Sequence, residues 1–280
     1  WVAQGKATSP AAAKEGVGDQ TVAETNEVFG IPMLTSSQVI AQMISAMDDK
    51  LDDRRPTFSD SADVGAIIIV VGFEDITKTF KELGEDYKAI SCYKKAIEIN
   101  SNYHEALNNL GVAYKDLKEF DSAIEAYQMA LNIKPDYAEA HNNIGIVYKE
   151  LGQLDDAIKS HEVALKIFPQ YAEAHNNLGI ILIEGKQLNE ATERFKKAIV
   201  SDHNFVEAYN NLGSALMELN DFDLSLENFQ KAISINPNYV EAQNNLGTLF
   251  MHLGQLDEAV ECFQKSIKID PNYEYAHNNL

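Results

Sequence analysis

The chain has 280 residues, 45% of them hydrophobic, and its 43 acidic residues outnumber 23 basic ones, giving a formal net charge of −20. Phosphate binding needs a basic face, so this charge argues against nucleic acid as a partner. The longest apolar run, at 66–71, is far shorter than the roughly 20 residues that a membrane-spanning helix needs. The acid excess fits either solubility with low self-association or a preference for basic or neutral partners.

The N-terminal quarter differs from the rest of the chain. Residues 1–34 are rich in Ala, Gly, Ser, Thr and Glu without apolar periodicity, which predicts disorder. Residues 35–69 begin with apolar side chains at helical spacing, which predicts an amphipathic helix at about 36–51 and then a linker. That helix either caps the open end of a repeat array or binds a partner. The β-branched run at 65–72 fits either a buried strand or the front of a first repeat helix.

From residue 70 the sequence repeats itself. The phrase Ala-His-Asn-Asn-Ile-Gly at 140–145 returns every 34 residues with small changes. The period divides the chain into six units and a truncated seventh: 70–103, 104–137, 138–171, 172–205, 206–239, 240–273 and 274–280. A fixed period of this length indicates a solenoid, in which each unit packs only on its neighbours.

Each unit carries two helical patterns, as unit 138–171 illustrates. Its first helix has one apolar face, formed by Ala140, Ile144, Tyr148 and Leu151. Gly152 permits a turn, and a second apolar face follows, formed by Ala157, Ile158, His161, Ala164, Leu165 and Ile167, before Pro169 ends the helix. The predicted fold is therefore all-α, an α-solenoid of helical hairpins.

The spacing of small and aromatic residues resembles the tetratricopeptide repeat family. In unit 104–137 the matching residues are Leu110, Gly111, Tyr114, Ala123, Tyr127, Ala130 and Pro135. The resemblance implies a right-handed superhelix of antiparallel helix hairpins. Unit 70–103 departs from the pattern, because Thr77 replaces the glycine and Tyr87 lies one place later than the aromatic of its sister units. We therefore expect that unit to be distorted.

The paired asparagines most resemble the repeat arrays of O-linked N-acetylglucosamine transferases. In those arrays an asparagine before each Leu or Ile lines the concave surface and contacts extended peptide backbone. The matching residues here are Asn109, Asn143, Asn177, Asn211, Asn245 and Asn279. These residues include no glycosyltransferase domain, so the resemblance implies recognition and not catalysis.

A helical projection places Glu139, Asn142 and Ile146 opposite the core of the first helix, with Asn143 at the edge. Amides can pair with the backbone of any extended peptide, and the glutamates favour a neutral or basic partner. The asparagines could instead bridge neighbouring repeats, or be inherited by duplication of one unit. The predicted binding residues are Asn108, Asn109, Asn142, Asn143, Asn176, Asn177, Asn210, Asn211, Asn244, Asn245, Glu139, Glu173 and Glu207.

The histidines suggest a metal site at first sight. His141, His175 and His277 share one repeat position, but neighbouring repeats are roughly 10 Å apart, too far for two zinc ligands. We expect them to pack at helix interfaces, and we expect His161 to replace a core aromatic. No phosphate-binding loop or nucleophile motif appears, so we predict neither a cofactor nor catalysis by these residues.

Cys92 and Cys262 are too far apart along a solenoid to form a disulfide, and no leader follows Trp1, which together favour a cytoplasmic protein. Our first functional hypothesis is an interaction scaffold that binds an extended peptide or a protein along its concave face. The second is the substrate-recognition arm of a peptide glycosyltransferase whose catalytic part follows Leu280. The third is end-to-end self-assembly of the open array.

Overall fold

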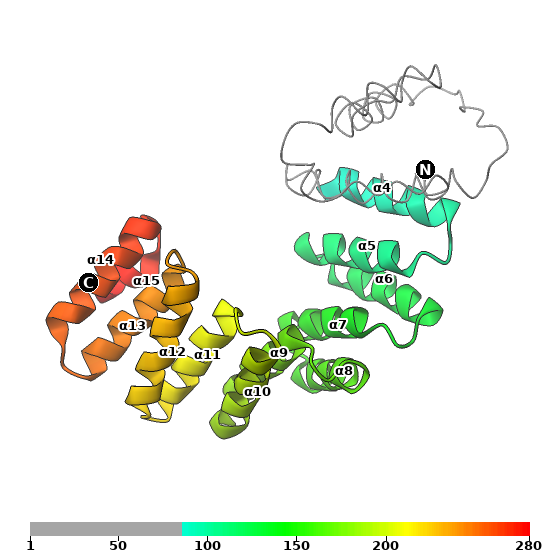
Figure 1. Cartoon of the computed structure of the whole chain (residues 1–280). Coiled ribbons are helices and arrows are strands. Elements are labelled where there is room, and N and C mark those ends of the chain that lie inside the picture. Colours follow the sequence, from blue (N-terminus) through cyan, green and yellow to red (C-terminus); the bar gives the residue numbers. More distant parts are fainter. Residues whose placement is uncertain (1–85) are drawn as a thin grey trace, which may run out of the picture. The chain divides into compact units, whose positions relative to one another are not determined.

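The computed structural model describes residues 86–280, and this part of the chain is built from α-helices with no β-strand (Figure 1). The all-α solenoid prediction is confirmed, while the handedness of the stack remains a prediction. The predictions for 1–34, for 35–69, for the run at 65–72 and for the first helix of unit 70–103 lie outside the described residues.

The helices follow the predicted 34-residue period. Unit 70–103 contributes its second helix, α4 (Asp86–Ile99). Every complete unit after it has a first helix of 13 residues and a second of 14. The pairs are α5 (His104–Asp116) and α6 (Phe120–Ile133), α7 (Ala138–Glu150) and α8 (Leu154–Ile167), α9 (Ala172–Glu184) and α10 (Leu188–Ser201), α11 (Val206–Glu218) and α12 (Phe222–Ile235), α13 (Val240–His252) and α14 (Leu256–Ile269), followed by α15 (Glu274–Asn279).

The expected distortion of the first unit is not seen in its second helix. Helix α4 begins and ends 34 residues before α6, so it occupies the same repeat positions. The displaced aromatic, Tyr87, is exposed rather than packed. Buried Ala89, Cys92 and Ala96 supply the core face of α4 instead, so the helix keeps its register without the aromatic.

Packing follows a simple order along the chain. The two helices of one repeat pack most extensively, as α9 does with α10, and each second helix then packs on the first helix of the next repeat. First helices also contact one another across repeats, as α7 does with α9. Successive second helices make no comparable contact in the part of the chain that the structure describes. The first helices therefore form a continuous face, while the second helices stand apart.

A glycine under an aromatic ring sets the close approach of the two helices in each repeat. Phe195 is completely buried, and a Cβ atom added to Gly179 would lie 2.6 Å from its Cε1 atom. The same relation joins Gly145 to His161, at 2.7 Å from its Cε1 atom. The expectation that His161 replaces a core aromatic is confirmed, because its side chain is completely buried.

Two apolar residues assigned to the core lie at helix ends and are exposed. Leu151 is 40% exposed and Ile167 is 36% exposed. Both follow the last core residue of their helix, where the chain already turns toward the next element and no neighbouring helix covers them. The helical period predicts the direction of a side chain but not where its covering partner ends.

The turn between the helices of a repeat requires a left-handed residue. This residue has φ between 59° and 75° in every complete repeat, and it is Lys118, Gly152, Lys186, Asn220 or Gly254. The backbone N–H groups of this residue and of the residue after it donate to carbonyls in the last turn of the first helix. Gly152 N–H donates to the Lys149 carbonyl at 2.9 Å, and Gln153 N–H donates to the Tyr148 carbonyl at 2.8 Å. Glycine adopts this conformation without the steric cost that a side chain brings.

Replacing Lys186 with glycine is therefore expected to stabilise the array by about 0.5–1 kcal/mol. Relief of the left-handed strain is partly offset by the greater freedom of glycine in the unfolded chain. Urea unfolding of the variant beside the wild type measures the difference. Gly152→Ala is the matched control, since no atom lies within 4 Å of the added Cβ, and it should destabilise by about 1 kcal/mol. Equal stability of all three proteins would contradict the turn argument.

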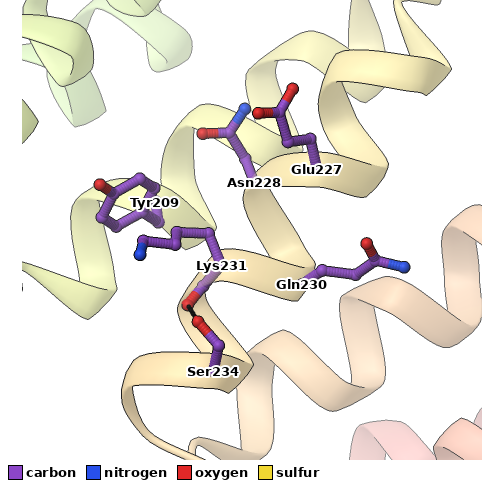
Figure 2. A pocket seen from close by; sticks show the side chains of 6 residues that line it. All are labelled: Tyr209, Glu227, Asn228, Gln230, Lys231 and Ser234. Carbon is purple, nitrogen blue, oxygen red and sulfur yellow. Dashed lines mark hydrogen bonds between the residues drawn. The ribbon is translucent and has the colours of Figure 1, made fainter.

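Clefts open on the side of the second helices, where those helices stand apart. One cleft of about 370 Å³ is lined by Tyr209 of α11 and by Glu227, Asn228, Gln230, Lys231 and Ser234 of α12 (Figure 2). An analogous cleft of about 560 Å³ lies one repeat earlier, between His175 of α9 and the residues of α10. The period of the fold therefore repeats its clefts as well as its helices.

Candidate functional site

The first helices are joined side by side by a chain of amide hydrogen bonds. In each bond the second asparagine of one repeat donates from Nδ2 to Oδ1 of the first asparagine of the preceding repeat. The pairs are Asn143 to Asn108 at 3.0 Å, Asn177 to Asn142 at 3.2 Å, Asn211 to Asn176 at 3.0 Å, Asn245 to Asn210 at 2.9 Å and Asn279 to Asn244 at 3.2 Å. We call these ten residues together with Asn109 the asparagine ladder.

The first asparagines of the ladder are buried between repeats. Asn108, Asn142, Asn176, Asn210 and Asn244 are between 0% and 6% exposed. The helical projection placed them on the face left for a ligand, and in this respect it was wrong. The helix of the next repeat covers them, and a buried amide needs the partner that this helix supplies. The alternative in which the asparagines bridge neighbouring repeats describes their observed contacts.

The second asparagines are only partly buried. Asn143, Asn177 and Asn211 each use one Nδ2 proton to hold the preceding repeat. Their Oδ1 atoms accept no hydrogen bond from another side chain within residues 86–280. A side chain held at its nitrogen has lost much of its rotamer freedom, so its oxygen is a pre-oriented acceptor for a further group.

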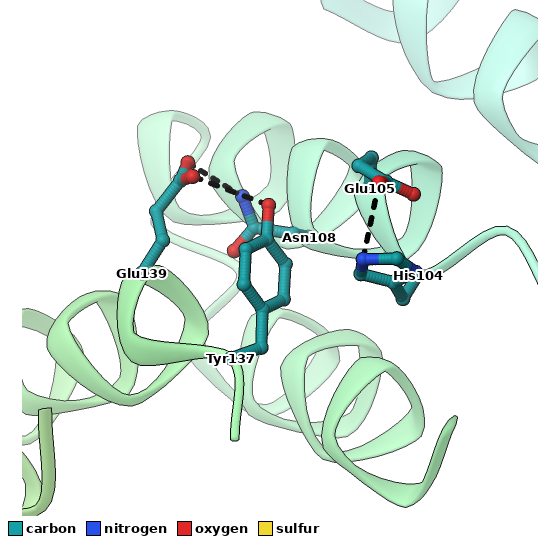
Figure 3. Close-up of polar contacts among 5 residues, drawn as sticks. All are labelled: His104, Glu105, Asn108, Tyr137 and Glu139. Atoms are coloured by element: carbon teal, nitrogen blue, oxygen red, sulfur yellow. Dashed lines mark hydrogen bonds and ion pairs between the residues drawn. The ribbon is translucent and has the colours of Figure 1, made fainter. Parts of the chain in front are cut away.

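The predicted glutamates lie beside the ladder, and Figure 3 shows the clearest case. Glu139 accepts a hydrogen bond from Asn108 Nδ2 at 2.9 Å and another from the Tyr137 hydroxyl at 3.1 Å. Burial raises the pKa of Tyr137, and the Glu139 carboxylate raises it further, so the hydroxyl keeps its proton and donates. Glu139 thus helps to hold two repeats together as well as carrying a negative charge.

The glutamates of later repeats are less engaged. Glu173 accepts a bond of 3.4 Å from the Tyr171 hydroxyl, and both Glu173 and Glu207 are exposed. Lys149 forms an ion pair with Glu184 of the next repeat at 3.4 Å. The face formed by the first helices therefore presents partly exposed amides flanked by carboxylates.

The repeated histidines make hydrogen bonds to the loop before their own helix, and of the three only His175 is buried as the packing prediction expects. His141, His175 and His277 each place Nε2 within 3.0 Å of a proline carbonyl six residues earlier, the carbonyls of Pro135, Pro169 and Pro271. Each imidazole thereby fixes the loop that enters its own helix. No group of three histidine, cysteine or acidic side chains converges to hold a metal ion in the part of the chain that is described.

Family models identify these repeats independently. Models described as TPR repeat or tetratricopeptide repeat match residues 78–118, 113–152, 136–199, 181–220, 206–239 and 240–273. The chain belongs to the tetratricopeptide repeat family. No curated protein matches its sequence. The finer resemblance to O-linked N-acetylglucosamine transferases remains a prediction.

Solved structures show the same fold. A structure described as YrrB, a TPR protein with an unusual peptide-binding site, is 24% identical and has a TM-score of 0.51, covering 66% of this chain and 96% of its own. MamA is 27% identical with a TM-score of 0.51, covering 59% and 96%. PilF of Pseudomonas aeruginosa is 18% identical with a TM-score of 0.65, covering 76% and 97%. Within 86–280, every helix is too short or too polar to cross a bilayer.

Proposed function

We propose that this protein is an interaction scaffold that binds an extended peptide segment along the face of its first helices. The observation that carries the proposal is the geometry of the second asparagine in three successive repeats, Asn143, Asn177 and Asn211. In each of them the Nδ2 atom is held by the preceding repeat, while the Oδ1 atom remains available as an acceptor for a peptide N–H group. An acceptor of this kind reads the backbone and tolerates many side chains.

The spacing of the ladder fits such a ligand. First helices packed side by side are roughly 10 Å apart, and an extended peptide advances by about 3.3 Å per residue. One asparagine would therefore meet every third peptide residue. Three successive repeats, with Asn143, Asn177 and Asn211, would hold a segment of about seven to nine residues.

The charges beside the ladder favour basic side chains in that segment. Glu173 and Glu207 are exposed, so they can attract lysine or arginine without the cost of burying a charge. Glu139 already accepts two hydrogen bonds, so we assign it a smaller part in ligand binding. The solved relatives support the class of function, since YrrB is described as having a peptide-binding site.

The first test changes the backbone of the peptide and leaves the asparagines of the protein unchanged. The probe is a fluorescein-labelled twelve-residue peptide repeating Lys-Thr-Val-Ser, measured by fluorescence anisotropy with the full chain. Methylating its amide nitrogens at every third residue removes the N–H donors, and we expect about tenfold weaker binding for one of the three possible registers. Replacing lysine by glutamine should weaken binding about threefold and reduce its salt dependence.

A protein variant supplies the second arm. Asn143, Asn177 and Asn211 changed together to alanine should lose binding, while circular dichroism and thermal unfolding report whether the array remains folded. The control is Asn132→Ala with Asn189→Ala, which removes two exposed asparagines of the second helices α6 and α10 that take no part in the ladder. Equal binding of all methylated peptides, or equal binding by a folded triple variant, would refute backbone recognition. The glycosyltransferase arm and end-to-end assembly remain predictions from the sequence alone.

A further inference from the structure

A second recognition surface lies away from the ladder, in the cleft beside α10. This cleft, which we call the α10 furrow, is floored by His175 at the start of α9 and bounded by the end of α8. Its lining residues on α10 are Glu193, Arg194, Lys196, Lys197, Val200 and Ser201. The furrow exists because α8 and α10, as successive second helices, do not pack closely against each other.

The furrow has a positive charge in an otherwise acidic protein. Three of its residues are cations, whereas Glu193 is its one acidic lining residue, and Glu193 forms an ion pair with Lys196 at 2.9 Å. Arg194 and Lys197 have no ion-pair partner among residues 86–280. Two cations are therefore left without a counter-charge, in a chain whose formal net charge is −20.

Two of these cations, Arg194 and Lys197, also lie close enough to His175 to affect its pKa. Burial lowers the pKa of His175, the hydrogen bond with the Pro169 carbonyl opposes the shift, and the charges of Arg194 and Lys197 lower the pKa further. Both cations thus lie close enough to act on the floor of the cleft.

An exposed apolar side chain stands beside the cations. Val200 is 73% exposed and lines the furrow. The corresponding residues of the other complete repeats are polar: Asn132, Lys166, Ser234 and Lys268. Leu165 and Pro169 supply further apolar lining at the end of α8. Together with Val200 they give the furrow an apolar part beside its cations.

The next repeat shows how the same cleft looks without these features. In Figure 2 the positions of Arg194, Lys196 and Val200 are held by Asn228, Gln230 and Ser234. The fold is the same in both repeats, so no requirement of folding explains the basic and apolar residues of the α10 furrow. Their combination is specific to one repeat.

We propose that the α10 furrow docks an acidic segment of a partner protein, in which a leucine or similar apolar side chain lies between carboxylates. The carboxylates pair with Arg194 and Lys197, and the apolar side chain packs on Val200 and the end of α8. Partly exposed ion pairs of this kind steer binding and select the partner. This surface is distinct from the ladder and of opposite preference, so each is testable alone.

The test variant carries the three changes R194N, K197Q and V200S, which remove the two cations without an ion-pair partner and the exposed valine. The control, K231Q with K265Q, also removes two positive charges, one from each of the two following repeats. The probe is a fluorescein-labelled ten-residue peptide of glutamate and leucine repeating Glu-Glu-Leu, titrated with the full chain at low and high salt. We expect about tenfold weaker binding by the triple variant and wild-type binding by the control.

Two further measurements test the role of the peptide leucine and the location of the binding site. Changing leucine to serine in the peptide should weaken its binding to the wild type about threefold, and V200S alone should remove that difference. Amide shifts in ¹H–¹⁵N NMR spectra should concentrate on His175 and α10. Equal affinities of the triple variant and the control would overturn the proposal, as would shifts concentrated on Asn143 and Asn177. Failure of this test leaves the ladder untouched, since its probe is a basic peptide.

Discussion

Replacing Phe195 with alanine is expected to lower the free energy of unfolding by about 3–5 kcal/mol. The ring is completely buried in a cluster to which three successive repeats contribute, through Leu165, Leu178 and Leu212. Its removal therefore weakens two repeat interfaces as well as one hairpin. Urea unfolding measured by circular dichroism gives the loss, and a fall below 1 kcal/mol would show that the repeats collapse into the cavity.

Gly179 provides a sharper test of the same contact, because the effect of Gly179→Ala should change sign. With Phe195 present, the new Cβ would lie 2.6 Å from the ring, and overpacking should cost about 1–3 kcal/mol. In the Phe195→Ala background the same change should stabilise by about 1 kcal/mol, since alanine is the better helix former and the space is empty. The same sign in both backgrounds would contradict the geometry.

His161→Phe is expected to remove a pH dependence from the stability of the array, although the variant also loses the hydrogen bond between His161 Nδ1 and Asn142 Oδ1 at 3.0 Å. Burial lowers the pKa of His161 to about 4, and Lys149 contributes a smaller effect. In the unfolded chain the pKa is about 6.5, so between these values the unfolded state binds more protons. Stability from this residue is complete above pH 6.5 and falls as the pH drops toward 4. At pH 5 the wild type should have lost about 2 kcal/mol that the variant retains.

The reciprocal variant Phe195→His should introduce the same dependence in the next repeat. The space is equivalent, because Gly145 and Gly179 approach their rings at nearly the same distance. Thermal unfolding between pH 4 and 7.5 for wild type, His161→Phe and Phe195→His separates this effect from the titration of the many carboxylates, which all three share. Parallel curves for the three proteins would show that the buried imidazole contributes nothing.

The helices, their pairing and the buried aromatic positions could be predicted because the period repeats the same local evidence in every unit. Gly145 and His161 are examples: a small residue and a ring recur at fixed places, so one sequence reveals the contact between them. The burial of Asn142 could not be predicted in the same way. Helical projection compares a residue with its own helix, whereas Asn142 is covered by the helix of the next repeat and bonded to Asn177.

The sequence also contains a signal for the α10 furrow, but a search for residues shared between repeats does not find it. When the repeats are aligned, the residues equivalent to Val200 are polar, and the residue equivalent to Arg194 in the next repeat is Asn228. The residues that the repeats share are those that the fold requires. A surface specific to one partner is found in the departures from that shared set.

Every rung of the ladder joins residues 35 apart, one more than the period, because the donor lies one place after the acceptor in the repeat phrase. Unequal recombination that adds or deletes a whole unit recreates a complete rung at each new junction. An insertion of any other length rotates the donor away by about 100° per residue and leaves a buried amide without its partner. The array can therefore lengthen or shorten during evolution only in steps of one repeat.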